Sequence, residues 1–322
     1  MTKKIILDTD PGIDDVMAIL FAEAHPDIDL IGITTVYGNA TIDNGMHNAL
    51  YLKQRFSMEA LVAKGTDKPL IRDPVGATVV VHGEAGLGDV TAPHSLDTKA
   101  IEKPAYQFII DSVRANPGDI TLVAVGPLTN LALALKAAPD IVDLVKEVVV
   151  MGGAFGENDH RGNVTPFAEA NIHDDPHAAD KVFTASWPVV IIGLDVTEES
   201  FFTSQYLDEL RDNAGEVGQF IWDISRYYLR FYSEKLGMDG CHVHDPSAIA
   251  YVIQPSLFKT RRGPIRVVTD GPAEGMTIQK VDQRNYMNDE WRLFPAQQVG
   301  VEVDNKTLLS LYRETLVQYS QQ

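Results

Sequence analysis

Four aspartates within eight residues are the most chemically distinctive feature of the sequence. Asp8 and Asp10 end an apolar run, and a Pro-Gly pair leads on to Asp14 and Asp15. Carboxylates this close together repel one another, so the cluster is reasonable only in water, with shared protons or around a cation. Oxygen donors suit Ca²⁺ or Mg²⁺ better than zinc. The alternative is that the aspartates cap a turn and the helix that follows, but one or two would be enough for capping.

The elements that position these carboxylates alternate between buried strands and helices over the first two-thirds of the chain. Apolar, β-branched runs predict strands at Ile5–Leu7, Leu30–Val36, Ile120–Val125, Val148–Met151 and Val189–Leu194. Helix-forming stretches separate them at Ala40–Phe56, Pro104–Ala115, Leu128–Ala138 and Pro176–Thr184. This order predicts an α/β fold with a mostly parallel sheet flanked by helices.

The last third of the chain has a different pattern. Thr203–Gln254 is mainly helical, Arg262–Val303 holds shorter strands with Gly, Asp and Asn turns, and a closing helix follows at Asn305–Tyr319. The sequence shows no linker-like break, internal repeat or low-complexity tract. We therefore expect one domain over residues 1–322, with a helical excursion and a C-terminal hairpin.

Polar residues and glycines follow the ends of four predicted strands. Asp10, Asn39, Gly126 and the pair Gly152-Gly153 each lie just beyond a C-terminal strand end. Open α/β sheets bind their ligands at this edge. The four strand ends therefore predict one shared crevice.

Composition narrows the class of protein. The 322 residues are 45% hydrophobic, so the chain can bury a full core. The net charge of −18 opposes binding to nucleic acid and favours a small or cationic partner. No apolar run approaches the roughly 18 residues of a membrane span, and none resembles a signal peptide. With a single cysteine, Cys241, these features predict a cytoplasmic protein that does not bind membranes.

Seven motifs occur in an order specific enough to compare with a known family. They are Asp-Thr-Asp-Pro-Gly-Ile-Asp-Asp at 8–15, Val-Tyr-Gly-Asn at 36–39, His-Gly-Glu-Ala-Gly-Leu at 82–87, Val-Gly-Pro-Leu-Thr-Asn at 125–130, Met-Gly-Gly at 151–153, Gly-Asn-Val-Thr-Pro-Phe-Ala-Glu-Ala-Asn at 162–171 and Val-His-Asp-Pro at 243–246. With these motifs the sequence resembles the inosine-uridine preferring nucleoside hydrolases over nearly its whole length. The resemblance implies a Rossmann-like nucleoside hydrolase fold, hydrolysis of ribonucleosides to ribose and free base in nucleoside salvage, and a homodimer or homotetramer.

The resemblance also implies a Ca²⁺ site formed by Asp10, Asp15, the backbone carbonyl of Val125 and Asp245. Ca²⁺ accepts both carboxylate and carbonyl oxygens, so this mixed set is chemically reasonable. Asp10 also resembles the family's general base, which takes a proton from the attacking water. A carboxylate near its ordinary pKa is a poor base for free water, so the cation must first acidify that water.

The substrate-binding residues that the resemblance implies lie around this cation. They are Asp14, Asn39, His82, Met151, Asn163, Glu169, Asn171, Tyr228 and Tyr232. Acceptors and amides suit the ribose hydroxyls, and tyrosines four residues apart share the helix face above the base. His82 resembles the histidine of a mobile loop that covers the site in relatives. His244, beside Asp245, is placed to act on the departing base as a proton donor or a base-contacting residue.

Other interpretations are open for several of these residues. Asn163, Glu169 and Asn171 also suit a polar loop that leads into a helix capped at Asp175. The two tyrosines also suit core packing. Cys241-His242-Val243-His244 suggests zinc, but no second ligand pair follows at zinc-site spacing.

Two other activities and two departures from the family pattern are also open. Asp8-Thr9-Asp10 suggests a haloacid-dehalogenase-type phosphatase, although Gly12 stands where that family has Thr or Val. A non-catalytic Ca²⁺- or nucleoside-binding protein is the second alternative. Leu236 differs from the family pattern, which leaves open how the leaving group is activated. Ala170 also differs, which leaves open how the polar residues beside it are packed. The preferred base is open as well.

Overall fold

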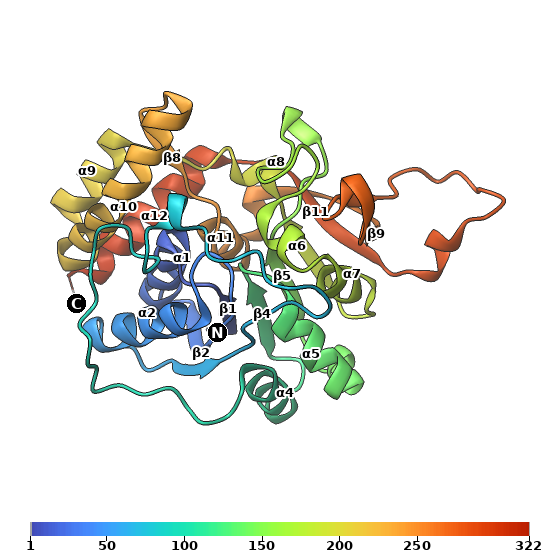
Figure 1. The fold of residues 1–322 in the computed structure, drawn as a ribbon, viewed down its shortest axis with the longest axis horizontal. Helices are drawn as coiled ribbons and strands as arrows, with labels where there is room; N and C mark the ends of the chain where they lie inside the picture. The colour runs from blue at the N-terminus through green and yellow to red at the C-terminus, as the bar shows by residue number, and fades with distance from the viewer. Residues whose placement is uncertain (1, 322) are drawn as a thin grey trace.

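A nine-stranded sheet forms the centre of the protein in the computed structural model, which describes residues 2–321 (Figure 1). Its strand order is β10-β9-β11-β6-β5-β4-β1-β2-β3. The strands are β1 (Lys3–Thr9), β2 (Ile28–Thr35), β3 (Leu61–Lys64), β4 (Ile120–Ala124), β5 (Glu147–Met151), β6 (Val189–Ile192), β9 (Phe258–Val267), β10 (Thr277–Gln279) and β11 (Ala296–Val303). All neighbours from β11 to β3 pair in parallel. The predicted α/β fold with a mostly parallel sheet is confirmed.

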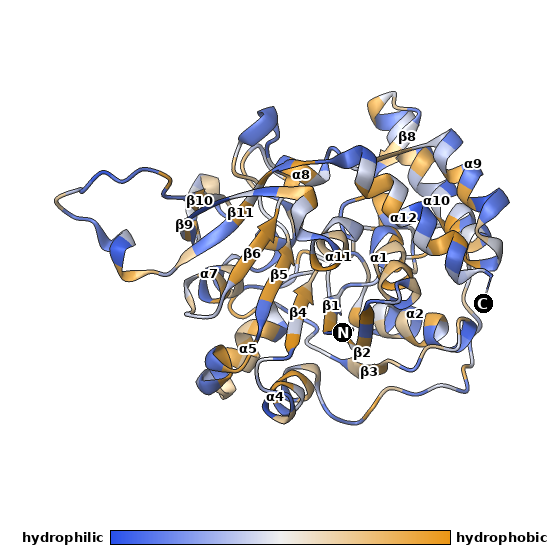
Figure 2. Ribbon diagram, turned by 180° about the vertical axis from the view of Figure 1, so that it is seen from behind, coloured by the Kyte–Doolittle hydropathy of each residue, from blue (hydrophilic) through white to orange (hydrophobic). Residues whose placement is uncertain are grey.

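Helices cover both faces of this sheet. They are α1 (Ile13–Ala24), α2 (Ile42–Arg55), α3 (Val79–His82), α4 (Ala105–Ala115), α5 (Thr129–Ala137), α6 (Ala170–Asp174), α7 (Pro176–Thr184), α8 (Leu194–Thr197), α9 (Ser204–Asn213), α10 (Gly215–Leu236), α11 (Pro246–Ile253) and α12 (Asn305–Tyr319). One hydrophobic core joins the sheet to α1, α2, α10, α11 and α12, and the other joins it to α4, α5 and α7. Figure 2 shows the central strands as hydrophobic, as expected for strands buried on both faces.

Side chains alternate between the two cores along each central strand. In β4, Val123 packs in the first core and Leu122 in the second. In β5, Val149 and Val150 divide in the same way. This period of two fixes the register of each strand, because a slip of one residue would exchange the two faces.

The predicted C-terminal hairpin extends the main sheet. β9 and β11 are antiparallel to each other, and β11 lies parallel to β6. Between β10 and β11 the chain projects from the body of the molecule, over residues 280–295 (Figure 1). The closing helix predicted at Asn305–Tyr319 is α12.

The helical excursion leads back to the edge of the sheet where the strands end. α9 and α10 pack against each other between β7 (Phe201–Thr203) and β8 (Gly240–His242), which form a small antiparallel sheet. Just after β8, α11 begins with Pro246 in its first turn. The link between β8 and α11 therefore carries the His-Asp pair at 244–245. The sequence does not predict β3, β7 or β8, because runs of three or four residues are too short to show alternation.

Candidate active site

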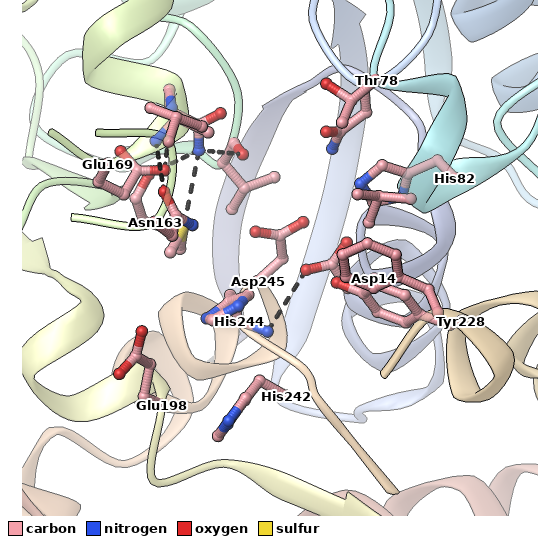
Figure 3. A pocket seen from close by; sticks show the side chains of 18 of the residues that line it. Asp14, Thr78, His82, Asn163, Glu169, Glu198, Tyr228, His242, His244 and Asp245 are labelled. Atoms are coloured by element: carbon pink, nitrogen blue, oxygen red, sulfur yellow. Dashed lines mark hydrogen bonds between the residues drawn. The ribbon is translucent and has the colours of Figure 1, made fainter. Parts of the chain in front are cut away.

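A cavity of about 360 Å³ opens at the C-terminal edge of the sheet (Figure 3). Twelve residues expected at the site line it: Asp14, Asn39, His82, Val125, Met151, Asn163, Glu169, Asn171, Tyr228, Tyr232, His244 and Asp245. Asp10 and Asp15 are not in the lining, and both are almost completely buried. The structure therefore gathers residues from seven distant motifs around one crevice.

Three clustered carboxylates form the acidic floor of the cavity, which Asp14 and Asp245 line and which the buried Asp15 completes from behind. Oxygens of Asp14, Asp15 and Asp245 lie within 4.8 Å of one another. Burial raises the pKa of Asp14 to about 7, and the charge of Asp15 adds to this rise. Burial also raises the pKa of Asp245 well above its ordinary value, helped by Asp14 and Asp15. Asp14 Oδ1 and Asp245 Oδ2 are buried without a hydrogen-bond partner. Unpaired, buried carboxylate oxygens of this kind fit a hard divalent cation.

Asp10 lies next to this floor and has one free oxygen. Its Oδ2 accepts a hydrogen bond from the Asn39 backbone N–H at 2.7 Å, and its Oδ1 is buried without a partner. A Cβ at Gly126 would lie 2.5 Å from Asp10 Oδ1, and one at Gly38 would lie 2.1 Å from Oδ2. The two glycines therefore leave the space that the carboxylate occupies. The trio of closest oxygens contains Asp14 rather than Asp10, so the assignment of Asp10 as a cation ligand stays a prediction.

Asp15 organises the turn before α1. Its Oδ1 accepts from Thr9 Oγ1 at 2.5 Å and from the Asp10 N–H at 3.2 Å. Its Oδ2 accepts from the Gly12 N–H at 3.0 Å and from Asn39 Nδ2 at 2.9 Å. The capping interpretation of the sequence therefore applies to this residue, and the same bonds fix its carboxylate against the acidic floor.

Asp8 stands apart from the trio. Its Oδ1 accepts hydrogen bonds from Thr34 Oγ1 at 2.5 Å and from Asn130 Nδ2 at 2.8 Å. Burial raises the pKa of Asp8 to about 7, against the opposing effect of these two bonds. Of the four aspartates in the first motif, only Asp14 and Asp15 thus belong to the trio around the acidic floor.

A second wall of the cavity comes from the loop before α6. Glu169 caps this helix, accepting from the N–H groups of Asn171 at 2.9 Å and Ile172 at 3.1 Å, and it also accepts from the Gly153 N–H at 2.9 Å. Asn163 Oδ1 accepts from the Ala170 N–H at 3.0 Å. The sequence predicts a cap at Asp175, which does cap α7, but it does not predict that Glu169 caps α6 while its side chain lines the cavity.

Asn171 connects two strand ends. Its Nδ2 donates to the carbonyls of Val125 at 2.8 Å and Met151 at 3.2 Å. The Val125 carbonyl, which the resemblance assigns to the cation, therefore already accepts one hydrogen bond. A carbonyl oxygen has two lone pairs, so a second partner is compatible with this bond.

Aromatic rings form the opposite end of the cavity. The ring of Tyr228 lies 5.5 Å from His82 and 5.1 Å from Tyr232, measured between centroids. Tyr232 contacts His242 at 5.6 Å, and His242 stacks on His244 at 6.1 Å. Both tyrosines are buried in the core and also line the cavity, so core packing and pocket lining occur together.

The two histidines predicted at the site are neutral at neutral pH. Burial lowers the pKa of His244 to about 3, helped by the neighbouring His242. Its Nδ1 lies 2.9 Å from Thr197 Oγ1, and its backbone N–H donates to Asp14 Oδ2 at 3.4 Å. Burial lowers the pKa of His82 to about 4, and its Nδ1 accepts from the Ile13 N–H at 3.1 Å. His82 is thus bonded to the start of α1, at the end of the short helix α3.

The remaining candidate cluster does not form a metal site. Among residues 2–321, the only group of three His, Cys, Asp or Glu side chains that could hold a metal is the aspartate trio. Cys241 is buried, and burial raises the pKa of its thiol. The structure therefore gives no support to zinc binding at Cys241-His242-Val243-His244.

Sequence reasoning did not identify four further residues at this site. Glu198, Phe231 and His242 line the cavity, and Thr197 contacts His244. Thr197 and Glu198 follow the end of β6, so the strand-end rule that found Asp10 and Asn39 could also have found them.

Comparison with solved structures gives the class of protein. The fold matches a plant nucleoside hydrolase, the PpNRh1 enzyme, with a TM-score of 0.94 and 36% sequence identity, over 98% of this chain and 99% of that chain. The fold and the acidic site together define an enzyme of the nucleoside hydrolase class.

Sequence comparison then gives the family. The family model described as inosine-uridine preferring nucleoside hydrolase matches residues 5–310. The inosine-uridine preferring nucleoside hydrolase of Crithidia fasciculata is 40% identical over 319 residues, which cover 98% of each chain. A probable uridine nucleosidase 2 of Oryza sativa subsp. japonica is 38% identical over 316 residues, or 98% of this chain and 93% of the relative. The chain belongs to the inosine-uridine preferring nucleoside hydrolase family. No helix among residues 2–321 has the length and apolar character needed to cross a bilayer.

Proposed function

We propose that the protein hydrolyses the N-glycosidic bond of ribonucleosides such as uridine or inosine, with Ca²⁺ bound, and releases ribose and the free base. The observation that carries this proposal is one cavity that combines a buried acidic floor with a wall of aromatic rings. Relatives named for inosine and uridine support the same choice. We place the reaction in nucleoside salvage in the cytoplasm.

The residues of the acidic floor fit a hard divalent cation. Asp14, Asp15 and Asp245 would hold it, together with Asp10 and the Val125 carbonyl at the adjoining strand ends. No Lys or Arg lines the cavity among the described residues, so no side-chain cation neutralises these carboxylates. Bound Ca²⁺ would supply Lewis-acid chemistry, lowering the pKa of a neighbouring water and of the ribose hydroxyls.

Asp10 is the base in this proposal. Its unpaired Oδ1 accepts the proton of the attacking water, while the Asn39 N–H holds its Oδ2 in place. Breaking the bond leaves positive charge on the ribose, as in glycoside hydrolysis, and the neighbouring carboxylates stabilise that charge. Asp14, Asn39, Asn163, Glu169 and Asn171 bind and orient the ribose hydroxyls, with Met151 beside them.

His244 serves the leaving base. Because its ring is neutral, it offers one N–H and one acceptor nitrogen. If Thr197 Oγ1 donates to Nδ1, the ring proton is on Nε2 and is free to stabilise the departing base. His82, Tyr228 and Tyr232 supply the flat faces against which the base packs.

A reducing-sugar assay on the purified protein tests the proposal. We expect release of ribose from uridine or inosine, and elemental analysis showing about one Ca²⁺ per chain. Release of phosphate from phosphate esters would favour the phosphatase alternative, and binding of nucleosides without turnover would favour a binding protein. Stoichiometric zinc without calcium would overturn the metal assignment.

We also propose that residues 1–322 act as one domain within a homodimer or homotetramer. A single sheet joins both hydrophobic cores, which supports one domain. The projecting segment between β10 and β11 exposes Met287 fully and Leu293 by 81%, and apolar side chains so placed are typical of contacts between subunits. Light scattering on the purified protein measures the mass of the assembly.

A further inference from the structure

Beyond His244 the cavity contains two polar side chains that the proposed mechanism does not use. Glu198 and His242 line the same cavity as Asp14 and Glu169. In Figure 3 they lie below His244, at the end of the cavity away from Glu169 and Thr78. Glu198 follows α8 and His242 ends β8, so two separate elements bring them together.

The position of Glu198 is fixed by a histidine. Glu198 Oε2 lies 2.5 Å from His160 Nδ1, and the other ring nitrogen of His160 lies 3.0 Å from Glu199 Oε1. No hydrogen bond among residues 2–321 involves Glu198 Oε1, so this oxygen is available to a ligand. The side chain of Glu198 is 24% exposed and lines the cavity, whereas that of Glu199 is 50% exposed and does not.

His242 also has a free polar atom. Its Nδ1 is buried and has no hydrogen-bond partner. Its ring is held by Phe201 at 5.2 Å, Tyr232 at 5.6 Å and His244 at 6.1 Å between centroids. Because this nitrogen is buried, the ring of His242 shapes this end of the cavity without offering it a hydrogen bond.

The other side chains near this end supply mainly apolar contact. Phe231 and Leu236 line the cavity beside Tyr228 and Tyr232. A nucleobase packed against these residues would lose water from the N–H and C=O groups on its edge, so it needs a polar partner there. A carboxylate such as that of Glu198 accepts an N–H.

We propose that Glu198 recognises the polar edge of the nucleobase, with its Oε1 accepting a ring N–H. This inference rests on the proposed nucleoside hydrolase function. This contact selects bases that carry a ring N–H, such as uracil and hypoxanthine. The same contact disfavours cytosine, which lacks this ring N–H, and bases that are methylated on this ring nitrogen. His160 acts as a positioning residue for Glu198.

The test compares Glu198→Ala with a matched control, Glu199→Gln, which alters the other carboxylate bonded to His160. For each protein, kcat/KM is measured for uridine, for N3-methyluridine and for p-nitrophenyl riboside. We expect Glu198→Ala to lower kcat/KM for uridine by about 10- to 100-fold, as for loss of a hydrogen bond to a charged group. N3-methyluridine lacks the N–H and the riboside lacks a base, so both should change by less than about threefold. Glu199→Gln should leave all three within about threefold of wild type.

Two results would overturn the inference. An equal loss on all three substrates would show that Glu198 only holds the loop of His160 in place, and an unchanged rate for uridine would show that Glu198 does not meet the base. If Glu198→Ala melts well below wild type, Glu198→Met provides the same comparison, because it keeps most of the side-chain volume and removes both carboxylate acceptors. Failure of the proposed function is a separate result, because wild-type protein would then release no sugar from uridine or inosine.

Discussion

Asp10 is the residue on which the proposed reaction depends most directly, because its free Oδ1 is the acceptor for the proton of the attacking water. Asp10→Asn keeps the size of the side chain and removes this base. We expect kcat for uridine or inosine to fall by about 10²- to 10⁴-fold, the range typical of acid-base groups. The reducing-sugar assay measures the fall. Near-normal turnover by a variant that still binds Ca²⁺ would rule out Asp10 as the base.

His244 separates leaving-group chemistry from sugar chemistry. We expect His244→Ala to lower kcat for uridine or inosine by about 10²-fold or more, since the contact strengthens only as charge develops on the base. A p-nitrophenyl riboside has a leaving group that departs unaided, so the same variant should hydrolyse it at a nearly normal rate. Equal losses on the two substrates would mean that His244 supports Asp14 or Asp245 instead.

Asp8 predicts a pH dependence of stability. Burial raises its folded-state pKa from 3.8 to about 7, so the folded protein holds a proton that the unfolded chain releases above about pH 4. The stability from this proton is fully present below about pH 4 and is lost as the pH rises through about 7. The test measures melting temperatures between about pH 4 and about pH 8, with a chelator present to remove bound metal. The melting temperature of wild type should fall more steeply over this range than that of Asp8→Asn, because the asparagine has no proton to lose. Parallel curves would contradict this assignment.

At the scale of elements, Asn171 holds the ends of β4 and β5 together. Asn171→Ala would leave two buried carbonyls, those of Val125 and Met151, without this donor. We expect the free energy of unfolding to fall by about 1–3 kcal/mol. Asn163→Ala is the matched control, because it removes an exposed amide from the loop before α6 and should cost less than about 1 kcal/mol. Urea unfolding measures both, and equal losses would exclude the bracing role.

The sequence predicts long elements and strand ends well, because burial on both faces leaves continuous apolar runs and because ligands gather at one edge of a parallel sheet. Asn39 lines the cavity at such a strand end, whereas most of the twelve expected residues in the lining come from the resemblance to the family. Contacts between distant segments were not predictable. Thr197 meets His244 only because the chain after α8 pairs with the chain at β8, and no local pattern links Glu198 to His160.

The different roles of the four aspartates also depend on the folded structure. Their spacing predicts a charge cluster, but the partners of Asp8 and Asp10 come from other strands and loops. Thr34 and Asn130 bind Asp8, whereas Asn39 binds Asp10. Only these contacts show which oxygens are left free for a ligand.

At the scale of the whole molecule, the net charge of −18 and the unpaired carboxylates make cation binding a source of stability. We expect CaCl₂ to raise the melting temperature of chelator-treated protein, since a ligand at about 100 times its Kd adds about 2.7 kcal/mol. NaCl at equal ionic strength is the control for general screening. Asp245→Asn should lose most of the calcium effect. An equal response to both salts would show that no specific cation site exists.

The order of strands has a consequence for how the chain folds during synthesis. β6 is complete by residue 192, but its partner β11 begins only at residue 296. Until the C-terminal residues leave the ribosome, one edge of β6 has unpaired N–H and C=O groups, and such an edge can pair with another nascent chain. The pairing also joins residues far apart in sequence, which slows folding. We therefore expect chains that stop before β11 to aggregate rather than to fold.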